Sequence, residues 1–314
     1  MTRYFLSRLG QGVLVLWAAW TLTFILLQLL PGNGVLIKFQ DPSLGLSPEQ
    51  IAQMQVLYGV RTPLWQQYFS SLLAVLRGDF GYSIQQGLPV SHLLRDSLPQ
   101  TLLLAAPAFV AALILGGGIA VLAFLPGLRF IQKWLFSVPP LLVSLPVFWL
   151  GIILIQVFSF SLHWVPVINP SPIVGLILPT LTLAIPLSAP LAQIMIRSLD
   201  EVNTRPFISV VRAKGASRTR TLLRHALRNA SLPVVTVAGL LLGELIAGAL
   251  VTETVFGLNG LGQLTWQAVN NQDVAVLQAV VMISALGFVI VNLLVDVLML
   301  WLDPRLHAQW REAH

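Results

Sequence analysis

Three carboxylates stand within or beside long apolar runs of the sequence, where a charged side chain needs a reason. They are Glu244, Glu253 and Asp296. A carboxylate inside a bilayer is costly, and it typically marks a solute pathway, a proton relay or a buried pair. Glu244 lies in the middle of its apolar run and is the best pathway candidate. We expect Glu253 to be partly hydrated near the outer end of that run, and Asp296 to hydrogen-bond Asn292 one helical turn earlier.

A second concentration of polar groups is the basic segment 197–233, which interrupts an otherwise apolar chain. It contains eight of the 18 Lys and Arg residues: Arg197, Arg205, Arg212, Lys214, Arg218, Arg220, Arg224 and Arg228. The charge alone fits either lipid headgroups or a docking element with apolar anchors and an arginine rim for a soluble cytoplasmic partner. Aromatic residues do not alternate with the arginines, so no nucleic-acid partner is expected.

The sequence contains few residues that could form a catalytic or metal-binding site. The chain has no cysteine, its five His residues are scattered, and it lacks the Gly-x-x-x-x-Gly-Lys-Ser/Thr loop that binds nucleotide phosphates. Neither His-Glu-x-x-His nor Gly-x-Ser-x-Gly occurs, which argues against a membrane-embedded hydrolase. The sequence therefore predicts a protein that is not an enzyme, binds no cofactor and has no metal site.

Transmembrane helices must position these groups. With 56% hydrophobic residues, 10% charged residues and a mean hydropathy of +0.82, the chain is far more apolar than a soluble domain. Apolar runs long enough to cross about 30 Å of hydrocarbon predict an all-α integral membrane protein with six spans. The predicted spans are residues 9–30, 101–125, 134–160, 172–196, 234–255 and 274–301.

Prolines within the third and fourth spans predict kinks that face protein or a pathway rather than lipid. Pro146 and Trp149 in the third span, and Pro186 in the fourth, therefore join Glu244 as pathway candidates. Residues 256–273, between the last two spans, form a turn-rich connection in this interpretation.

The segment after the first span is polar and is predicted to lie in water. Ser47, followed by Pro48 and by Gln50 three residues on, predicts a capped helix that runs toward residue 58. A second helix is predicted near residues 64–76, and it ends at a glycine-rich turn.

Charge assigns the orientation of the six spans. With an inside N-terminus, 14 Lys and Arg residues fall on one side and 4 on the other, so the positive-inside rule places both termini in the cytoplasm. The predicted organisation is a cytoplasmic N-terminus with the first helix (1–30), an extracytoplasmic segment (31–99), a five-helix core that includes segment 197–233 (100–302) and a cytoplasmic tail (303–314).

Local signals inside the basic segment predict two short helices joined at a glycine. Pro206 suits a first helical turn, Gly215 suits the left-handed conformation that ends a helix, and Ser217 can cap a second helix over 218–230. Pro233 would then restart the chain into the membrane. One face of the second helix would carry Leu222, Leu223, Ala226, Leu227 and Ala230.

These residues also carry a resemblance. Arg212-Ala213-Lys214-Gly215, followed after nine residues by His225 to Ala230 and then by Leu232-Pro233, resembles the cytoplasmic coupling loop of ABC importer permeases of the dipeptide, oligopeptide and nickel type. Fragments in matching order extend it along nearly the whole chain: Gly78-Asp79-Phe80-Gly81 with Ser83, Leu98-Pro99 with Thr101-Leu102, Ser144-Leu145-Pro146 with Phe148-Trp149 and Gly151, Ile177-Leu178-Pro179, Arg197-Ser198, Glu253 with Phe256, Gly260-Leu261-Gly262, Asn292 to Asp296, and Asp303-Pro304.

The resemblance indicates the first of two permease subunits in a bacterial inner membrane. It implies a second homologous permease, two ATP-binding subunits that hold ATP and Mg, and an extracytoplasmic solute-binding protein. It assigns ATPase coupling to Arg212, Ala213, Lys214, Gly215, Leu222, Leu223, Arg224, His225, Leu227, Arg228, Asn229, Leu232 and Pro233. It assigns outer-surface contacts with the binding protein to Asp79, Phe80, Gly260 and Gly262.

Some positions depart from the family pattern. The family usually has Pro-Gly-Asp-Pro where this chain has Pro31-Gly32-Asn33-Gly34, a proline where it has Asn259, and Glu-Ala-Ala where it has Ser209-Val210-Val211. The substrate stays open among peptides, nickel and opine-like metallophores. The carboxylates within the spans motivate one alternative from another class, a proton- or ion-coupled secondary transporter.

Overall fold

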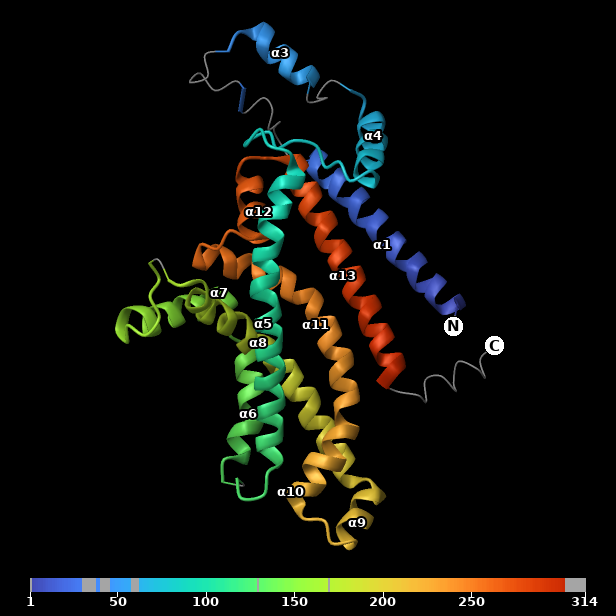
Figure 1. Cartoon of the computed structure of the whole chain (residues 1–314), viewed down its shortest axis with the longest axis vertical. Helices are drawn as coiled ribbons and strands as arrows, with labels where there is room; N and C mark the ends of the chain where they lie inside the picture. The colour runs from blue at the N-terminus through green and yellow to red at the C-terminus, as the bar shows by residue number, and fades with distance from the viewer. Residues whose placement is uncertain are drawn as a thin grey trace. The chain divides into compact units, whose positions relative to one another are not determined.

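The computed structural model describes residues 2–29, 38–39, 46–57, 62–128, 130–168 and 170–302, and these are almost entirely helical (Figure 1). The described residues form no β-strand. They contain one isolated antiparallel bridge, between Tyr82 and Pro89. The predicted all-α fold is confirmed. Residues 31–34, where the chain departs from the family pattern, and the tail 303–314 lie outside the described residues.

Five of the described helical runs are long and apolar enough to cross a membrane. They are α1 (Thr2–Leu29), α5 (Val90–Phe124), α8 (Pro172–Thr204), the run that continues into α11 (Leu227–Phe256), and α13 (Val274–Leu302). The last of these agrees with the predicted sixth span. A bent pair of shorter helices occupies the predicted third span.

The third span is broken rather than kinked. Helix α6 (Gln132–Val143) and the run formed by α7 (Val147–Leu154) and a π-helix, η2 (Ile155–Ser161), meet at an angle of 108°. Pro146 is responsible, because a proline disfavours helical geometry in the preceding residue, and Pro146 itself is extended with ψ 131°. The Ser144 hydroxyl donates to the Leu141 carbonyl at 2.8 Å and helps to end α6.

The chain divides into two compact units. The first comprises residues 1–101 and 257–289. It contains α3 (Pro48–Leu57), where the Ser47 and Gln50 side chains accept hydrogen bonds from each other's backbone N–H at 3.3 and 2.8 Å. The predicted cap is thus confirmed, and the predicted second helix is present as α4 (Leu64–Leu76).

Two boundaries in the first unit differ from prediction. Helix α5 begins at Val90 rather than near residue 101, and residues 261–270 form a helix, α12 (Leu261–Asn270), where turns were expected. The physical reason is shared burial, because Val90 and Leu94 of α5 belong to one buried cluster with Leu261 and Leu264 of α12. Turn residues flank α12 but do not interrupt it.

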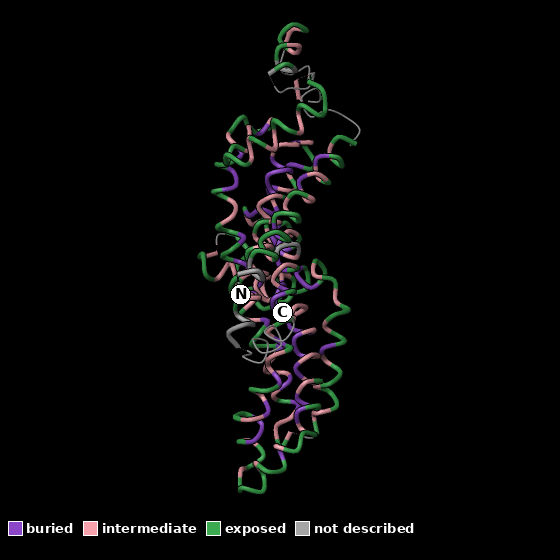
Figure 2. Tube along the Cα trace, turned by 90° about the vertical axis from the view of Figure 1, so that its right-hand side faces the viewer, coloured by how far each residue is buried: buried purple, intermediate pink, exposed green. Residues whose placement is uncertain are grey.

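The second unit comprises residues 102–256 and 290–314. Its helices α5 and α8 approach closely along small residues, since a Cβ added to Gly116 would lie 2.7 Å from the Ser188 carbonyl oxygen. Small residues at four-residue spacing let helix backbones pack in this way, as expected between membrane helices. Buried small residues repeat at that spacing on both helices: Ala108, Ala112 and Ala120 on α5, and Ala184, Ser188 and Ala192 on α8. In Figure 2, buried positions alternate with exposed ones along individual helices.

Candidate functional site

The basic segment folds locally as its residues predict. Helix α9 (Pro206–Ala213) ends two residues before Gly215, whose φ of +86° is the left-handed conformation that glycine tolerates. The Gly215 N–H donates to the Arg212 carbonyl at 3.0 Å, and the Ala216 N–H to the Val211 carbonyl at 3.3 Å. The Ser217 hydroxyl accepts from the Arg220 N–H at 3.2 Å and caps α10 (Arg218–Arg220).

The chain then continues into the membrane helix without a break. A π-helix, η3 (Thr221–Ala226), connects α10 directly to α11, so the predicted restart at Pro233 is wrong. Tertiary packing overrides the proline: buried residues recur every four positions through this region, and Pro233 lies on the exposed side. The buried positions are Leu222, Ala226, Ala230, Val234 and Ala238.

Burial separates the predicted coupling residues into two groups. Leu222 is only 4% exposed and belongs to the unit's own core with Ile208 and Leu199, so it is unavailable to a partner. Leu222 therefore anchors the segment in this unit's core, and its assignment to ATPase coupling stays a prediction. Leu223 is 49% exposed, and Val210, which sequence reasoning missed, is a second exposed apolar residue on the segment.

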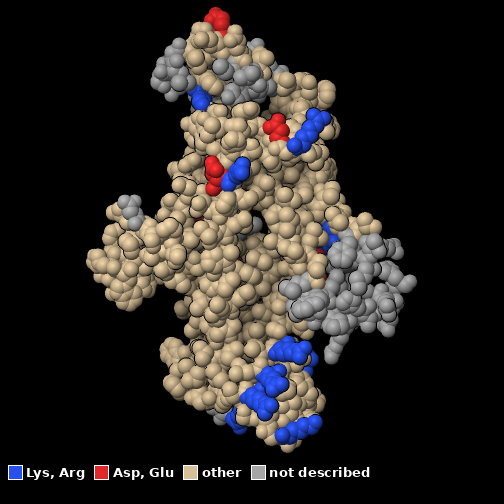
Figure 3. Space-filling model, in the orientation of Figure 1, with Lys and Arg blue, Asp and Glu red and all other residues tan. Residues whose placement is uncertain are grey.

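Most of the other predicted coupling residues face outward. The exposed set is Arg212, Ala213, Lys214, Gly215, Arg224, Arg228, Asn229 and Pro233, while His225, Leu227 and Leu232 are half-buried. Asn229 also donates from its amide to the His225 carbonyl at 2.8 Å. Figure 3 shows Lys and Arg gathered over the end that carries α9 and α10, whereas the neighbouring helical surface has few charges.

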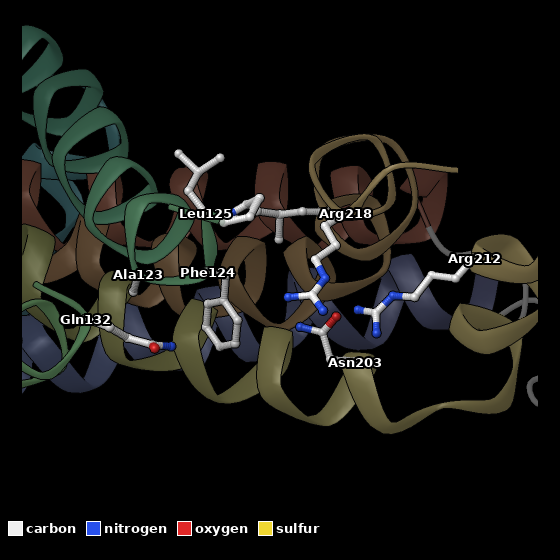
Figure 4. Close-up of a pocket in the computed structure, with 9 residues that line it drawn as sticks. Ala123, Phe124, Leu125, Gln132, Asn203, Arg212 and Arg218 are labelled. Atoms are coloured by element: carbon white, nitrogen blue, oxygen red, sulfur yellow. The ribbon is translucent and has the colours of Figure 1, made fainter. Parts of the chain in front are cut away.

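A pocket of about 570 Å³ opens beside this segment within the second unit. Its wall is formed by Ala123, Phe124, Leu125, Pro126, Gln132, Asn203, Arg212, Arg218 and Leu222. The Arg212 and Arg218 side chains reach toward Asn203 from two sides (Figure 4). Sequence reasoning missed the pocket because its residues come from four separate stretches.

The carboxylates differ in their surroundings. Glu244 lies on α11 and is exposed on this chain, and Asp296 on α13 is half-buried. Glu253 is only 1% exposed, so the expectation that it is partly hydrated is wrong. The end of α11 is covered because α7 and α8 pack against it; a Cβ on Gly151 of α7 would lie 3.3 Å from the Phe256 ring.

The remaining pathway candidates lie on two other helices. Pro146 immediately precedes α7 and is exposed, Trp149 on α7 is exposed, and Pro186 is half-buried within α8. Among the described residues no three His, Asp or Glu side chains come together as a metal-binding group.

The fragments predicted to face the binding protein are held by buried hydrogen bonds within the first unit. Asp273, 2% exposed, accepts from the Ser83 hydroxyl at 2.5 Å and from the Gln85 N–H at 3.3 Å. The buried Thr101 hydroxyl accepts from the Leu261 N–H at 2.8 Å. We call these five residues the polar clasp. The sequence offered no signal for the role of Asp273 beyond a polar residue before an apolar run.

The predicted outer-contact residues accordingly separate. Asp79 is exposed and accepts from the Gly81 N–H at 2.9 Å, and Phe80 packs partly against the buried cluster of α5 and α12. Gly260 and Gly262 are buried, so the prediction that they make surface contacts is wrong. Elsewhere in this unit, the Ser47 side chain donates to the fully exposed Glu49 carboxylate and lowers its pKa below the ordinary value.

Comparison with known proteins identifies the family of this chain. Residues 112–308 match the family described as "Binding-protein-dependent transport system inner membrane component". The chain belongs to this family. The permease is 33% identical over 311 residues to the "Probable peptide ABC transporter permease protein y4tP" of Sinorhizobium fredii, which covers 96% of this chain and 98% of that protein. It is 34% identical over 304 residues to the "Glutathione transport system permease protein GsiC" of Escherichia coli K12, covering 97% and 98% respectively.

A solved structure shares the permease fold. Inward-facing MetNI methionine ABC transporter aligns with a TM-score of 0.56 at 19% identity, over 67% of this chain and 96% of that chain. Together with its family and apolar helices, this makes the chain a multi-pass inner-membrane permease component of an ABC importer. It is a non-catalytic subunit.

Proposed function

We propose that this permease imports short peptides as one of two permease subunits, and that segment 206–230 couples it to two ATP-binding subunits. The observation that carries the coupling role is the division of burial within the segment. Leu222, Ala226 and Ala230 anchor it in the permease's own core, while the neighbouring Arg224 and Arg228 are exposed. A docking surface needs such a rigid base and a free polar rim.

The peptide assignment is supported by the relatives, one named for peptides and one for glutathione, which is itself a short peptide. Nickel and opine-like metallophores are the other candidates that the resemblance implies. In this proposal an extracytoplasmic binding protein delivers the solute, and the partner subunits bind the ATP and Mg.

Glu244 supports a shared pathway. An exposed carboxylate on a membrane helix would be costly against lipid, so the side of α11 that carries it should face protein or water. A second permease packed on that side would enclose Glu244 in the pathway. Pro146, Trp149 and Pro186 would line the same pathway from α7 and α8.

Charge reversal tests the coupling role. Arg224→Glu with Arg228→Glu should reduce co-purification with the ATP-binding subunits by roughly tenfold or more, because two favourable charges become repulsive. The matched control is Arg77→Glu with Arg95→Glu, which reverses two exposed arginines of the first unit. Gly215→Pro should also weaken docking. Equal co-purification of the Arg224/Arg228 variant and the control would contradict the proposed surface.

Transport in reconstituted vesicles tests the substrate and the energy source. We expect uptake of labelled dipeptides or tripeptides that needs the binding protein, stops on ATP depletion and persists when the proton gradient is collapsed. Uptake of nickel but not of peptides would contradict the substrate, and uptake that follows the proton gradient would favour the secondary-transporter alternative.

A further inference from the structure

The pocket beside α9 and α10 has the chemistry of a site for an amphiphilic anion. Two guanidinium groups, from Arg212 and Arg218, extend toward the amide of Asn203 (Figure 4). Gln132 adds a second amide to the lining. Arginine and amide N–H groups together are the donors that bind phosphate oxygens in proteins.

Neither guanidinium is neutralised by its neighbours. Among the residues that the structure describes, Arg212 and Arg218 form no ion pair, whereas Arg205 on the same segment pairs with Glu201 at 3.0 Å. The turn at Gly215 brings the two arginines together, since one lies before the turn in α9 and the other begins α10. Two guanidinium groups held side by side repel each other, and an anion bound between them offsets this repulsion because both groups attract it.

The opposite wall of the pocket is apolar. Ala123 and Phe124 come from the end of α5, and Leu125 and Pro126 follow them directly. A free phosphate would gain nothing from this wall, but the glycerol and acyl carbons of a phospholipid would bury apolar area against it.

The pocket lies where membrane helices end. Its residues come from the end of α5, the start of α6 and the last turns of α8. Trp134, two residues after Gln132, is 75% exposed on the first turn of α6. Exposed tryptophans are typical of the level at which helices cross from hydrocarbon to headgroups.

We infer that this pocket binds the phosphate of an anionic phospholipid in the leaflet nearest the basic segment. Arg212, Arg218 and Asn203 hold the phosphate, and the end of α5 contacts the glycerol backbone and first acyl carbons. Basic pockets between membrane helices on the cytoplasmic side bind acidic headgroups in this manner. A bound lipid would connect α5, α8 and the coupling segment through one headgroup.

Lipid titration of the purified full-length chain in detergent tests the site. The probe is phosphatidylglycerol with a fluorescent acyl chain, and the comparison lipid is phosphatidylcholine with the same label. Arg212→Gln with Arg218→Gln should weaken phosphatidylglycerol binding roughly tenfold or more and leave the weak phosphatidylcholine binding unchanged. The matched control, Arg220→Gln with Arg224→Gln, removes two exposed arginines that do not line the pocket and should change the affinity less than about twofold.

Competition experiments distinguish a phospholipid from free phosphate as the ligand of the pocket. Inorganic phosphate and glycerophosphoglycerol, which lack acyl chains, should displace the lipid only at far higher concentration. Displacement by inorganic phosphate at the lipid's own concentration would overturn the lipid assignment. Asn203→Ala should also weaken binding, and it provides a test that keeps both charges.

Two other results would overturn the proposal. Equal losses for both arginine pairs would show diffuse surface charge rather than a built pocket. Unchanged lipid affinity of the Arg212/Arg218 variant, with loss of co-purifying ATP-binding subunits, would assign the two arginines to a protein partner instead.

Discussion

In the polar clasp of the first unit, the residues that identify the family point inward. Ser83 and Thr101 are buried, and their hydroxyls hold Asp273 and the start of α12. Along the coupling segment of the second unit, most residues of the family fragment point outward, and its arginines are exposed. The same kind of sequence signal therefore has two physical origins. One region buries its residues to hold its own fold together. The other leaves most of them exposed, where the proposed partner would contact them.

Leu222→Ala should give the largest effect, because Leu222 is the largest of the three buried residues, with Ala226 and Ala230, that anchor the coupling segment in the core. Truncating a buried leucine should lower the free energy of unfolding by about 2 to 4 kcal/mol. Leu223→Ala, the adjacent exposed position, should change it by less than about 0.5 kcal/mol. Thermal unfolding of both purified variants in detergent gives the measurement. Equal shifts would mean that the segment does not pack as described.

Asp273→Ala tests the clasp itself. The variant removes the carboxylate that accepts the hydrogen bond of the buried Ser83 hydroxyl. We expect the free energy of unfolding to fall by about 1 to 3 kcal/mol. Asp79→Ala, which removes only an exposed turn hydrogen bond, should cost less. Asp273→Asn keeps an acceptor oxygen and should fall between them. A stability of Asp273→Ala equal to that of Asp79→Ala would remove the contrast between the two regions.

Gly215→Ala tests whether the coupling segment depends on backbone geometry rather than burial. No atom crowds the added methyl group, so the cost is that of a left-handed alanine, about 1 to 2 kcal/mol. Gly118→Ala, inside α5 and equally uncrowded, should instead be neutral or stabilising. Gly215→Ala should lower the unfolding temperature, whereas Gly118→Ala should leave it unchanged or raise it. An equal decrease in both variants would argue against the turn.

Ser217→Ala should have the smallest effect and act only at the start of α10. Loss of its cap to the Arg220 N–H should cost about 1 kcal/mol. Ser137→Ala in α6, where the hydroxyl bonds only its own helix, is the control and should be nearly neutral. Protection of the Arg220 amide from hydrogen exchange would report the cap directly, and undiminished protection in the variant would contradict it.

The sequence predicted the helix caps and the glycine turn, because these features depend on residues close together in the chain. The caps at Ser47 and Ser217 and the left-handed Gly215 depend on neighbours within three or four residues, which the sequence contains side by side. The exposed arginines of the coupling segment were also predictable, because charge avoids a core.

Tertiary context decided the rest. Pro233 does not end its helix, because buried neighbours on both sides keep it in place, whereas Pro146 starts a turn of 108°. Pro146 and Pro233 both stand between apolar residues in the sequence. No local signal indicates that the helix breaks at Pro146 and continues through Pro233. Glu253 and Leu222 are buried by helices distant in the chain, so neither burial nor the pocket at Asn203 could be derived from spacing.

The uninterrupted passage from η3 into α11 joins the basic segment to the far end of that helix in one continuous helical run. Its 30 residues measure about 45 Å, the thickness of a whole bilayer with its headgroups. A displacement of α10 would thus be passed toward Glu253 and Phe256 along one helical run, with no loop in between to absorb it.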